Sequence, residues 1–211
     1  MRVLMSIGGM AMLSACATAP SHPPAALNYA ERTCADQPDL TAAISLTPPK
    51  ERAVFTVTAP VTSETPCMQT DRGISPAVIF ALPTDYDDKT IIVGGMLEPL
   101  RILSPHVAVL DRNGDVTRTF PADEFLYRGR VYSVQFRPRE NETYLRVSVE
   151  PERVGRSYDS IAIGVNYTTV PVGYTAALIA TGVEDRSSRA FSYEGSIQVM
   201  VNDTDTKEDK T

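Results

Sequence analysis

From residue 53 onward, the chain is dominated by short runs in which apolar and polar residues alternate. The clearest run, TYLRVSV at 143–149, has Leu145, Val147 and Val149 on one side and Tyr144, Arg146 and Ser148 on the other. Alternation with a period of two is typical of a β-strand that has one face in the core and one in solvent. We therefore predict a strand here whose apolar side faces the core and whose polar side faces outward.

Five further runs have the length and composition of strands. AVFTVT (53–58), VYSVQF (131–136) and SIQVMV (196–201) alternate, whereas AVIFAL (77–82) is apolar throughout and predicts a strand buried on both faces. TIIVGGM (90–96) is β-branched as far as Gly94-Gly95, where we expect a bulge or a kink. Frequent short strands, few helical periods and 16 prolines together predict an all-β fold, an antiparallel β-sandwich of jelly-roll-like type with short helical turns.

Asn113-Gly114 lies between the apolar stretches VAVLD and VTRTF and predicts a hairpin. Asn-Gly fits the two positive-φ positions of a type I′ turn. A two-residue turn would place Val107 opposite Phe120, Val109 opposite Arg118, and Asp111 opposite Val116. Valines and Phe120 then share one face, and Arg118 does not fit among them.

Three segments have less definite patterns. Residues 121–125 (PADEF) are compatible with one helical turn, and residues 151–160 (PERVGRSYDS) with a polar loop. Residues 170–182 (VPVGYTAALIATG) fit either a strand or a short buried helix, because periodicity does not separate the two in a short apolar run.

The first residues are predicted to be an export signal. Arg2 precedes the apolar stretch VLMSIGGMAML, and Leu13-Ser14-Ala15-Cys16 follows. Small residues before a cysteine at this place form a bacterial lipobox, which predicts cleavage before Cys16 and lipidation of that residue. Several acyl chains give stable anchoring, and Ala17, in place of aspartate, favours the outer membrane facing the periplasm. The alternative is an ordinary secretory signal cut nearby, with Cys16 incidental.

These observations divide the chain into four parts: a lipoprotein signal peptide at 1–15, a lipidated, proline-rich tether at 16–30, a β-sandwich domain at 31–201 and a polar disordered tail at 202–211. Loss of residues 1–15 would remove Arg2 and change the net charge from −6 to −7. An acidic chain without a basic run gives no indication of nucleic-acid binding. The membrane is therefore the first expected partner, through the N-terminal lipid.

Two cysteines remain once Cys16 is lipidated. Cys34 and Cys67 are an even pair in an exported chain, and such pairs usually form a disulfide. A catalytic role for either thiol would need a nearby histidine, which neither has in the sequence.

Catalytic and metal-binding signatures are absent from the sequence. His22 lies in the tether and His106 at the start of a predicted strand, where a packed or solvated role is expected. There is no Gly-x-Ser-x-Gly elbow or Ser-x-x-Lys pair, and no histidine- or cysteine-rich metal spacing. Residues 111–115 (DRNGD) resemble a calcium loop only superficially, since an EF-hand needs glycine at its sixth position and here it is fourth. We expect no enzyme activity, no cofactor and no metal.

The order of these segments resembles the maltose-operon periplasmic protein family. The similarity lies in GISPAVIFALP (73–83), an apolar strand ending in Leu-Asp (107–111), Phe120-Pro121, and Phe125–Tyr127. It continues more faintly through 144–149 and 195–199, so it covers roughly residues 73–201. The resemblance implies an exported protein that is encoded with maltodextrin-uptake genes and has no assigned catalytic residues. The lipobox and the charged tail depart from the family pattern.

Two functions are carried forward. The first is a non-enzymatic accessory lipoprotein for carbohydrate transport of maltodextrin type or for glycan binding. Tyrosines would stack on the sugar, and the candidates are Tyr144, Tyr158, Tyr167 and Tyr174, with 151–174 as the expected binding loop. The second is a structural or assembly lipoprotein that contacts other envelope proteins without a small ligand. Packing within the fold is the alternative role of each tyrosine.

Overall fold

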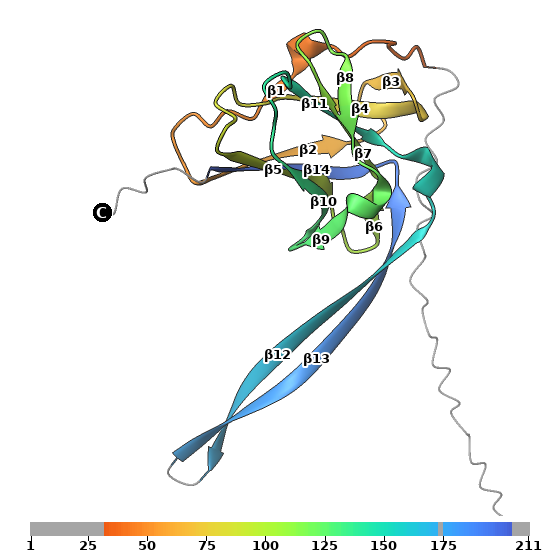
Figure 1. The fold of residues 1–211 in the computed structure, drawn as a ribbon. Helices are drawn as coiled ribbons and strands as arrows, with labels where there is room; N and C mark the ends of the chain where they lie inside the picture. The colour runs from red at the N-terminus through yellow and green to blue at the C-terminus, as the bar shows by residue number, and fades with distance from the viewer. Residues whose placement is uncertain (1–31, 173–174, 204–211) are drawn as a thin grey trace, which may run out of the picture.

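The computed structural model describes residues 32–172 and 175–203 of the chain. These residues form an all-β structure in which two sheets pack face to face, and a long two-stranded hairpin extends away from them (Figure 1). The predicted all-β, antiparallel β-sandwich fold class is confirmed. The signal peptide, the whole of the tether and residues 173–174 and 204–211 lie outside the described residues.

The first sheet has the strand order β1-β4-β11-β7-β8, and β3 pairs with β4 at its margin. Its strands are β1 (Ile44–Ser45), β3 (Cys67–Thr70), β4 (Gly73–Ala81), β7 (Pro105–Leu110), β8 (Val116–Thr119) and β11 (Tyr144–Val149). β1 runs parallel to β4, and the other neighbours in this sheet are antiparallel. The predicted strands at 77–82 and 143–149 are thus two central neighbours of one sheet.

The second sheet is antiparallel throughout and has the order β2-β14-β5-β10-β9. Its strands are β2 (Val54–Val61), β5 (Lys89–Met96), β9 (Leu126–Arg128), β10 (Val131–Phe136) and β14 (Gly195–Asp203). β14 continues two residues beyond the predicted domain end at 201. Its Asp203 carboxylate lies 2.6 Å from the Lys89 Nζ, so the expected tail at 202–211 begins too early by two residues.

The core lies between the two sheets, where the inward residues of the alternating strands meet. Leu145, Val147 and Val149 of β11 are at most 1% exposed, as are Ile197 and Val199 of β14. Full burial of each such side chain stabilises the fold by roughly 1.5–3 kcal/mol relative to exposure. The period-two pattern therefore identified the core-facing residues of these strands correctly.

The outer face of β11 does not face solvent, and that prediction is wrong. Arg146 is 6% exposed and Ser148 1%. Tyr144 is half-buried and packs with Leu40 and Ala43 against a second apolar cluster that includes Met68 of β3. β11 is the middle strand of its sheet, and chain from far away in the sequence covers its outer side, which a local pattern does not reveal.

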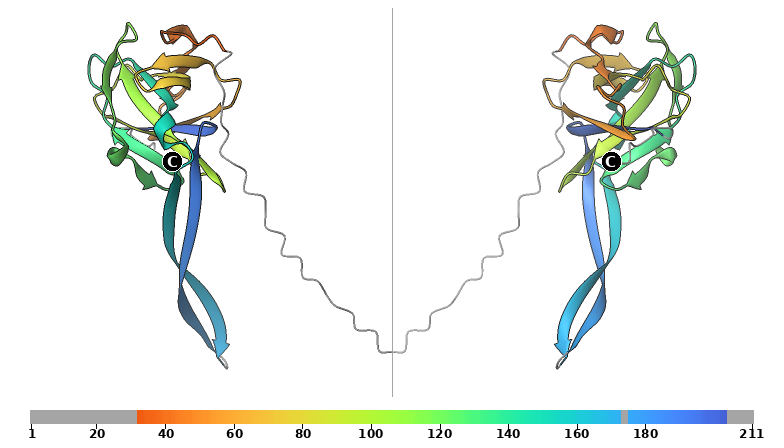
Figure 2. Two further views of the ribbon diagram at one scale, coloured as in Figure 1. Left: turned by 90° about the vertical axis from the view of Figure 1, so that its right-hand side faces the viewer. Right: turned by 90° about the vertical axis from the view of Figure 1, so that its left-hand side faces the viewer.

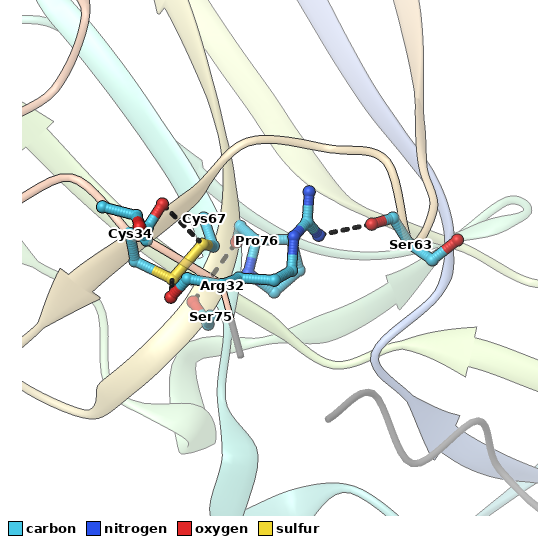
Figure 3. The surroundings of a disulfide bond; sticks show 7 residues. Arg32, Cys34, Ser63, Cys67, Ser75 and Pro76 are labelled. Carbon is cyan, nitrogen blue, oxygen red and sulfur yellow. Dashed lines mark hydrogen bonds between the residues drawn. A yellow bond between two sulfur atoms is a disulfide. The ribbon is translucent and has the colours of Figure 1, made fainter. Parts of the chain in front are cut away.

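A disulfide joins this covering segment to the sheet. Cys34 and Cys67 are bonded, as predicted (Figure 3). Beside the bond, the Ala35 N–H donates to the Cys67 carbonyl at 3.0 Å and the Gln69 N–H donates to the Ala35 carbonyl at 2.9 Å. The 3-10 turn η1 (Leu40–Ala42) follows, so the disulfide holds the start of the domain against the outside of the first sheet.

The hairpin of β7 and β8 forms as predicted, but its turn is of another type. Val109 pairs with Arg118, whereas Leu110 in place of Asp111 pairs with Val116, because the register shifts at a bulge. Gly114 has φ +90°, and no other type of residue in the described chain has positive φ, so Asn113 does not adopt the type I′ conformation. The Asp111 carboxylate instead accepts hydrogen bonds from the Asn113 and Asp115 N–H groups.

Gly94 and Gly95 lie in an unbroken strand rather than at a bulge or kink. A Cβ on Gly94 would be 2.0 Å from the Tyr132 carbonyl oxygen, and one on Gly95 would be 2.5 Å from the Leu103 carbonyl oxygen. Glycine at both positions allows β5 to lie directly against neighbouring backbone.

Two short 3-10 turns occupy the loops whose patterns were less definite. The turn η2 (Ala122–Glu124) confirms the helical turn expected at 121–125. The turn η3 (Pro151–Arg153) opens the expected polar loop at 151–160, but a strand already begins at Ser157. None of the helical segments in the described chain is long and apolar enough to cross a membrane.

The third sheet consists mainly of the projecting hairpin. β12 (Ser157–Val172) pairs antiparallel with β13 (Thr175–Ser192) along its whole length, and β6 (Arg101–Leu103) pairs with the base of β13. Residues 170–172 and 175–182 are therefore strand, and the helical alternative is excluded for them. We call residues 159–172 and 175–188 the arm and the two packed sheets the body. The arm leads away from the body in every view (Figures 1 and 2).

Candidate functional site

A cleft of about 420 Å³, lined mostly by charged residues, lies where the arm joins the body. Four segments meet there: the turn between β3 and β4, the link from β8 into η2, the end of β11 with η3, and the start of β12. They contribute three arginines, three carboxylates and a short apolar wall. These residues are Arg72, Arg153, Arg156, Asp123, Glu150, Glu152 and the segment 120–122.

The local sequence PERVGR explains why several charged groups gather here. Pro151 occupies the first turn of η3, where its fixed φ is favourable and its missing N–H is not needed. The turn closes when the Val154 N–H donates to the Pro151 carbonyl at 3.1 Å. Gly155, with φ +83°, then donates its N–H to the Phe191 carbonyl at 2.8 Å and directs the chain into β12.

Arg153 is held by aromatic rings of the core. Its guanidinium carbon lies 4.2 Å from the centre of the Phe191 ring and 5.1 Å from that of Tyr132. Its Nη2 donates to the Tyr132 hydroxyl oxygen at 2.9 Å. Such stacking favours a cation over an aromatic face and fixes the orientation of the guanidinium plane.

Two buried polar atoms of the cleft residues have no hydrogen-bond partner within the described part of the protein. They are Arg153 Nη1, a donor, and Glu150 Oε1, an acceptor. The other oxygen of Glu150 is 3.9 Å from Arg72 Nε, which is an ion pair without hydrogen-bond contact. Buried polar atoms without partners are uncommon in folded proteins, and each calls for an explanation.

The electrostatics of the cleft are balanced. Burial raises the pKa of Glu150, and the nearby Arg72 and Arg153 oppose this only in part. With three guanidinium groups and three carboxylates around the cleft, no single sign of charge dominates. The cleft therefore offers both donors and acceptors to a ligand without the excess of positive charge that a phosphate or polyanion site usually has.

The tyrosines chosen from the sequence are not brought together here. Tyr144 packs on the outer side of the first sheet, away from this cleft. Tyr158 lies at the base of the arm, with its ring 4.9 Å from that of Tyr132 and 5.9 Å from that of Phe191, and burial raises its pKa. Tyr167 lies in β12 of the arm, and Tyr174 is outside the described residues. Neither Tyr144 nor Tyr158 is among the residues that line the cleft.

Sequence reasoning identified the region but not the residues. The first part of the expected binding segment 151–174 does line the cleft, whereas the rest of it is strand. The charged residues Arg72, Glu150 and Arg153 were not predicted, although the alternating charges of PERVGR directly after a strand are a signal. Arg72 comes from the turn between β3 and β4, far from PERVGR in the sequence, so the charge pattern of PERVGR does not indicate that Arg72 lines the same cleft.

His106 and the acidic residues do not form a second site. The His106 ring is buried, its Nδ1 is 3.3 Å from the Ser148 hydroxyl, and burial lowers its pKa. In the part of the chain that the structure describes, no group of three or more His, Cys, Asp or Glu side chains is arranged to hold a metal ion.

Neither a scan against protein-family models nor a search of curated proteins found a match for this chain.

Proposed function

We propose that the mature protein is a non-enzymatic periplasmic lipoprotein, anchored in the outer membrane through Cys16, that binds a glycan in the cleft at the base of the arm. A maltodextrin is the first candidate ligand, from the resemblance to the maltose-operon periplasmic proteins. The observation that carries the proposal is the pair of unpartnered buried atoms, Arg153 Nη1 and Glu150 Oε1.

A hydroxyl group is the chemical complement of that pair. It donates one hydrogen bond and accepts up to two, so neighbouring hydroxyls of a sugar can serve a guanidinium donor and a carboxylate acceptor together. Hydrogen bonds to charged groups are worth about 1.5–3 kcal/mol each. The fixed orientation of Arg153 on Phe191 and Tyr132 reduces the entropy lost on binding.

Balanced charge supports a neutral ligand. A phosphate or a sulfated chain would meet Asp123, Glu150 and Glu152 as well as the arginines. Like charge facing a ligand disfavours it and so contributes to specificity. Phe120 is largely buried, and together with Pro121 and Ala122 it gives the cleft a short apolar wall against which the apolar part of a sugar can pack.

The binding experiment measures calorimetric titration and thermal shift with maltoheptaose on the full-length mature protein. Binding should be weakened by about ten-fold or more in Glu150→Ala, because the ligand loses a charged acceptor. Glu51→Ala, an exposed carboxylate of the loop before β2, is the matched control and should bind as the wild type does. If maltodextrins and other neutral envelope glycans leave the melting temperature unchanged, the glycan-binding function is refuted.

The anchoring part has its own test. Cys16→Ser should abolish incorporation of labelled lipid and leave the protein as precursor or in the soluble fraction. Unchanged maturation and membrane association in that variant would refute the anchor while leaving the cleft proposal untouched.

A structural or assembly role is the second candidate, and the arm is the observation that favours it. The two strands of the arm pair with each other and extend away from the body, so they are placed to contact another envelope protein (Figure 2). Crosslinking in cells that recovers the protein with other envelope proteins, together with no response to any glycan, would favour this function over the first.

A further inference from the structure

The arm has a long strand edge to which the described chain gives no partner. In the sheet order β12-β13-β6, β12 is an outer strand, so its second edge is unpaired from Ser157 to Val172. β13 is covered by β6 only at Ala190–Ser192. Outside the base, both edges of the arm therefore carry unpaired backbone N–H and C=O groups (Figure 1).

The sequence of this edge lacks the features that normally prevent pairing with another strand. No Asp, Glu, Lys, Arg or His occurs between Ile161 and Val183. Charges flank this stretch at Asp159 and at Glu184–Arg186. Native proteins protect exposed edges with charged residues, prolines or bulges, and here Pro171 near the tip is the only proline in the two strands.

An arm of this kind is not expected to be stable by itself. A two-stranded hairpin that packs on nothing is marginal in water, and a third strand or a packed face is needed. The sequence of β12 has apolar or aromatic residues at four successive odd positions, Ile161, Ile163, Val165 and Tyr167. The unpaired edge of the arm therefore calls for a partner.

We infer that the arm pairs with the arm of a second copy of this chain, β12 against β12, antiparallel about a two-fold axis. Residues 160–172 of β12 contain no charged side chain. Two identical edges can therefore run antiparallel about a two-fold axis without placing a charge against the partner arm. A pairing centred on Tyr167 joins residues 162–172 of the two copies. At about 3.3 Å per residue they span about 36 Å and form on the order of ten backbone hydrogen bonds, the number found in a typical specific interface.

The alternation in β12 restricts the register to pairings in which odd positions of one copy face odd positions of the other, because a shift by one position would mix the two sets. Among these we place the centre of the pairing at Tyr167, where two aromatic residues face each other. Tyr167 then lies opposite the same residue of the second copy. Lipid is a poorer partner, since hydrocarbon leaves the backbone groups of both edges unsatisfied. The inference does not depend on the ligand of the cleft.

The first experiment tests the register in cells. Tyr167→Cys in the full-length protein should form a disulfide-linked dimer on mild oxidation, because directly opposite residues of antiparallel strands are within disulfide reach. Ser188→Cys, an exposed position on β13 near the base, is the matched control and should stay monomeric. The wild-type chain, with Cys16, Cys34 and Cys67, gives the background.

The second experiment measures the sedimentation of the full-length protein in mild detergent. The wild type should be dimeric, and Tyr167→Lys, which places two like charges directly opposite each other, should weaken the dimer by about ten-fold or more. Val116→Lys adds the same charge to an exposed strand of the body and should leave the dimer intact. Unchanged melting of the body shows that both variants fold.

Three results would overturn the inference. They are a monomeric wild type, a dimer that Tyr167→Lys does not weaken, and crosslinking through Ser188→Cys instead of Tyr167→Cys. A thiol at position 167 that is shielded from labelling only when phosphatidylethanolamine–phosphatidylglycerol vesicles are added would identify lipid as the partner and would also overturn it.

Discussion

The body and the arm are built from the same element, the antiparallel strand, but they are stabilised in different ways. Strands of the body bury one face against the opposite sheet, as Val147 and Val199 do, and the central strands are covered on both faces. Strands of the arm pair only with each other along most of their length. Period-two patterning is therefore sufficient to predict a strand, but it does not tell whether the strand has a core to pack against.

Substitution of one glycine in each region gives the largest expected contrast. Gly94→Val in β5 introduces a Cβ 2.0 Å from the Tyr132 carbonyl oxygen and 2.6 Å from the Ser133 Cα, so β10 must move away from β5. We expect a loss of more than about 4 kcal/mol in the free energy of unfolding, measured in urea, or failure to fold. Gly164→Val in the arm should change that free energy by less than about 0.5 kcal/mol.

A similar loss in both glycine variants would contradict the comparison. It would mean that the arm and the body unfold as one cooperative unit. Equal, small effects would instead mean that β5 and β10 can separate without disturbing the rest of the body.

The disulfide gives the second-largest effect, and it should be confined to the body. Cys34 and Cys67 are 33 residues apart in sequence, and closing a loop of that length stabilises by about 3–4 kcal/mol in the chain-entropy account. The double variant Cys34→Ser/Cys67→Ser should lower the urea midpoint accordingly. Hydrogen exchange of the arm amides should be the same as in the wild type, and a change there would show coupling between the regions.

Gly114→Val should have a smaller effect, in the turn between β7 and β8. Gly114 has φ +90°, a conformation that valine adopts only with strain, and its Cβ would lie 3.0 Å from Pro38 Cγ. We expect destabilisation of about 1–3 kcal/mol, measured by thermal unfolding. Gly114→Asn, which tolerates positive φ better, should recover part of this loss. Wild-type melting of Gly114→Val would show that the turn rearranges freely.

Much of the body could be predicted from the sequence, because burial against the opposite sheet determines which residues alternate. The Cys34–Cys67 pairing, the inward face of β11 and the Val109–Arg118 register were all accessible in this way. The covered outer face of β11 was not, because the covering residues are distant in the sequence. Arg118 is informative here: its guanidinium lies over Phe136 at 4.9 Å and pairs with Glu142 at 2.8 Å, so a charge on an apolar face has distant partners.

The arm and the cleft were less accessible for a related reason. An uncharged run such as 170–182 is compatible with a buried strand, a helix or a free hairpin, and its length alone does not separate these. The cleft depends on Arg72, Phe120 and Glu150, which lie on three different connections. Only the strand order brings them together.

The smallest effect concerns the junction of the two regions, where Glu150 lies. Burial raises the pKa of this carboxyl, so the folded state binds a proton more readily than the unfolded state does. The favourable contribution of protonated Glu150 is fully present below the pKa of a carboxyl in the unfolded chain and is lost as the pH rises through the raised value in the folded state. At neutral pH the wild type therefore contains an ionised group that folding disfavours.

Glu150→Gln removes that charge and keeps the shape of the side chain. We expect the variant to melt at a slightly higher temperature than the wild type at pH 7. The difference should shrink as the pH falls through the raised pKa of Glu150 and should be gone below about 4, where an ordinary glutamate is also protonated. Glu51→Gln removes an exposed carboxylate before β2 that is not among the charges acting on Glu150, and it is the control for the loss of one negative charge. If Glu150→Gln melts lower than the wild type at pH 7, the ion pair with Arg72 at 3.9 Å outweighs the burial of the carboxylate. Glu150 would then stabilise the junction through its charge. Its unpartnered Oε1 would no longer indicate that the protein retains a destabilising carboxylate in order to bind a ligand.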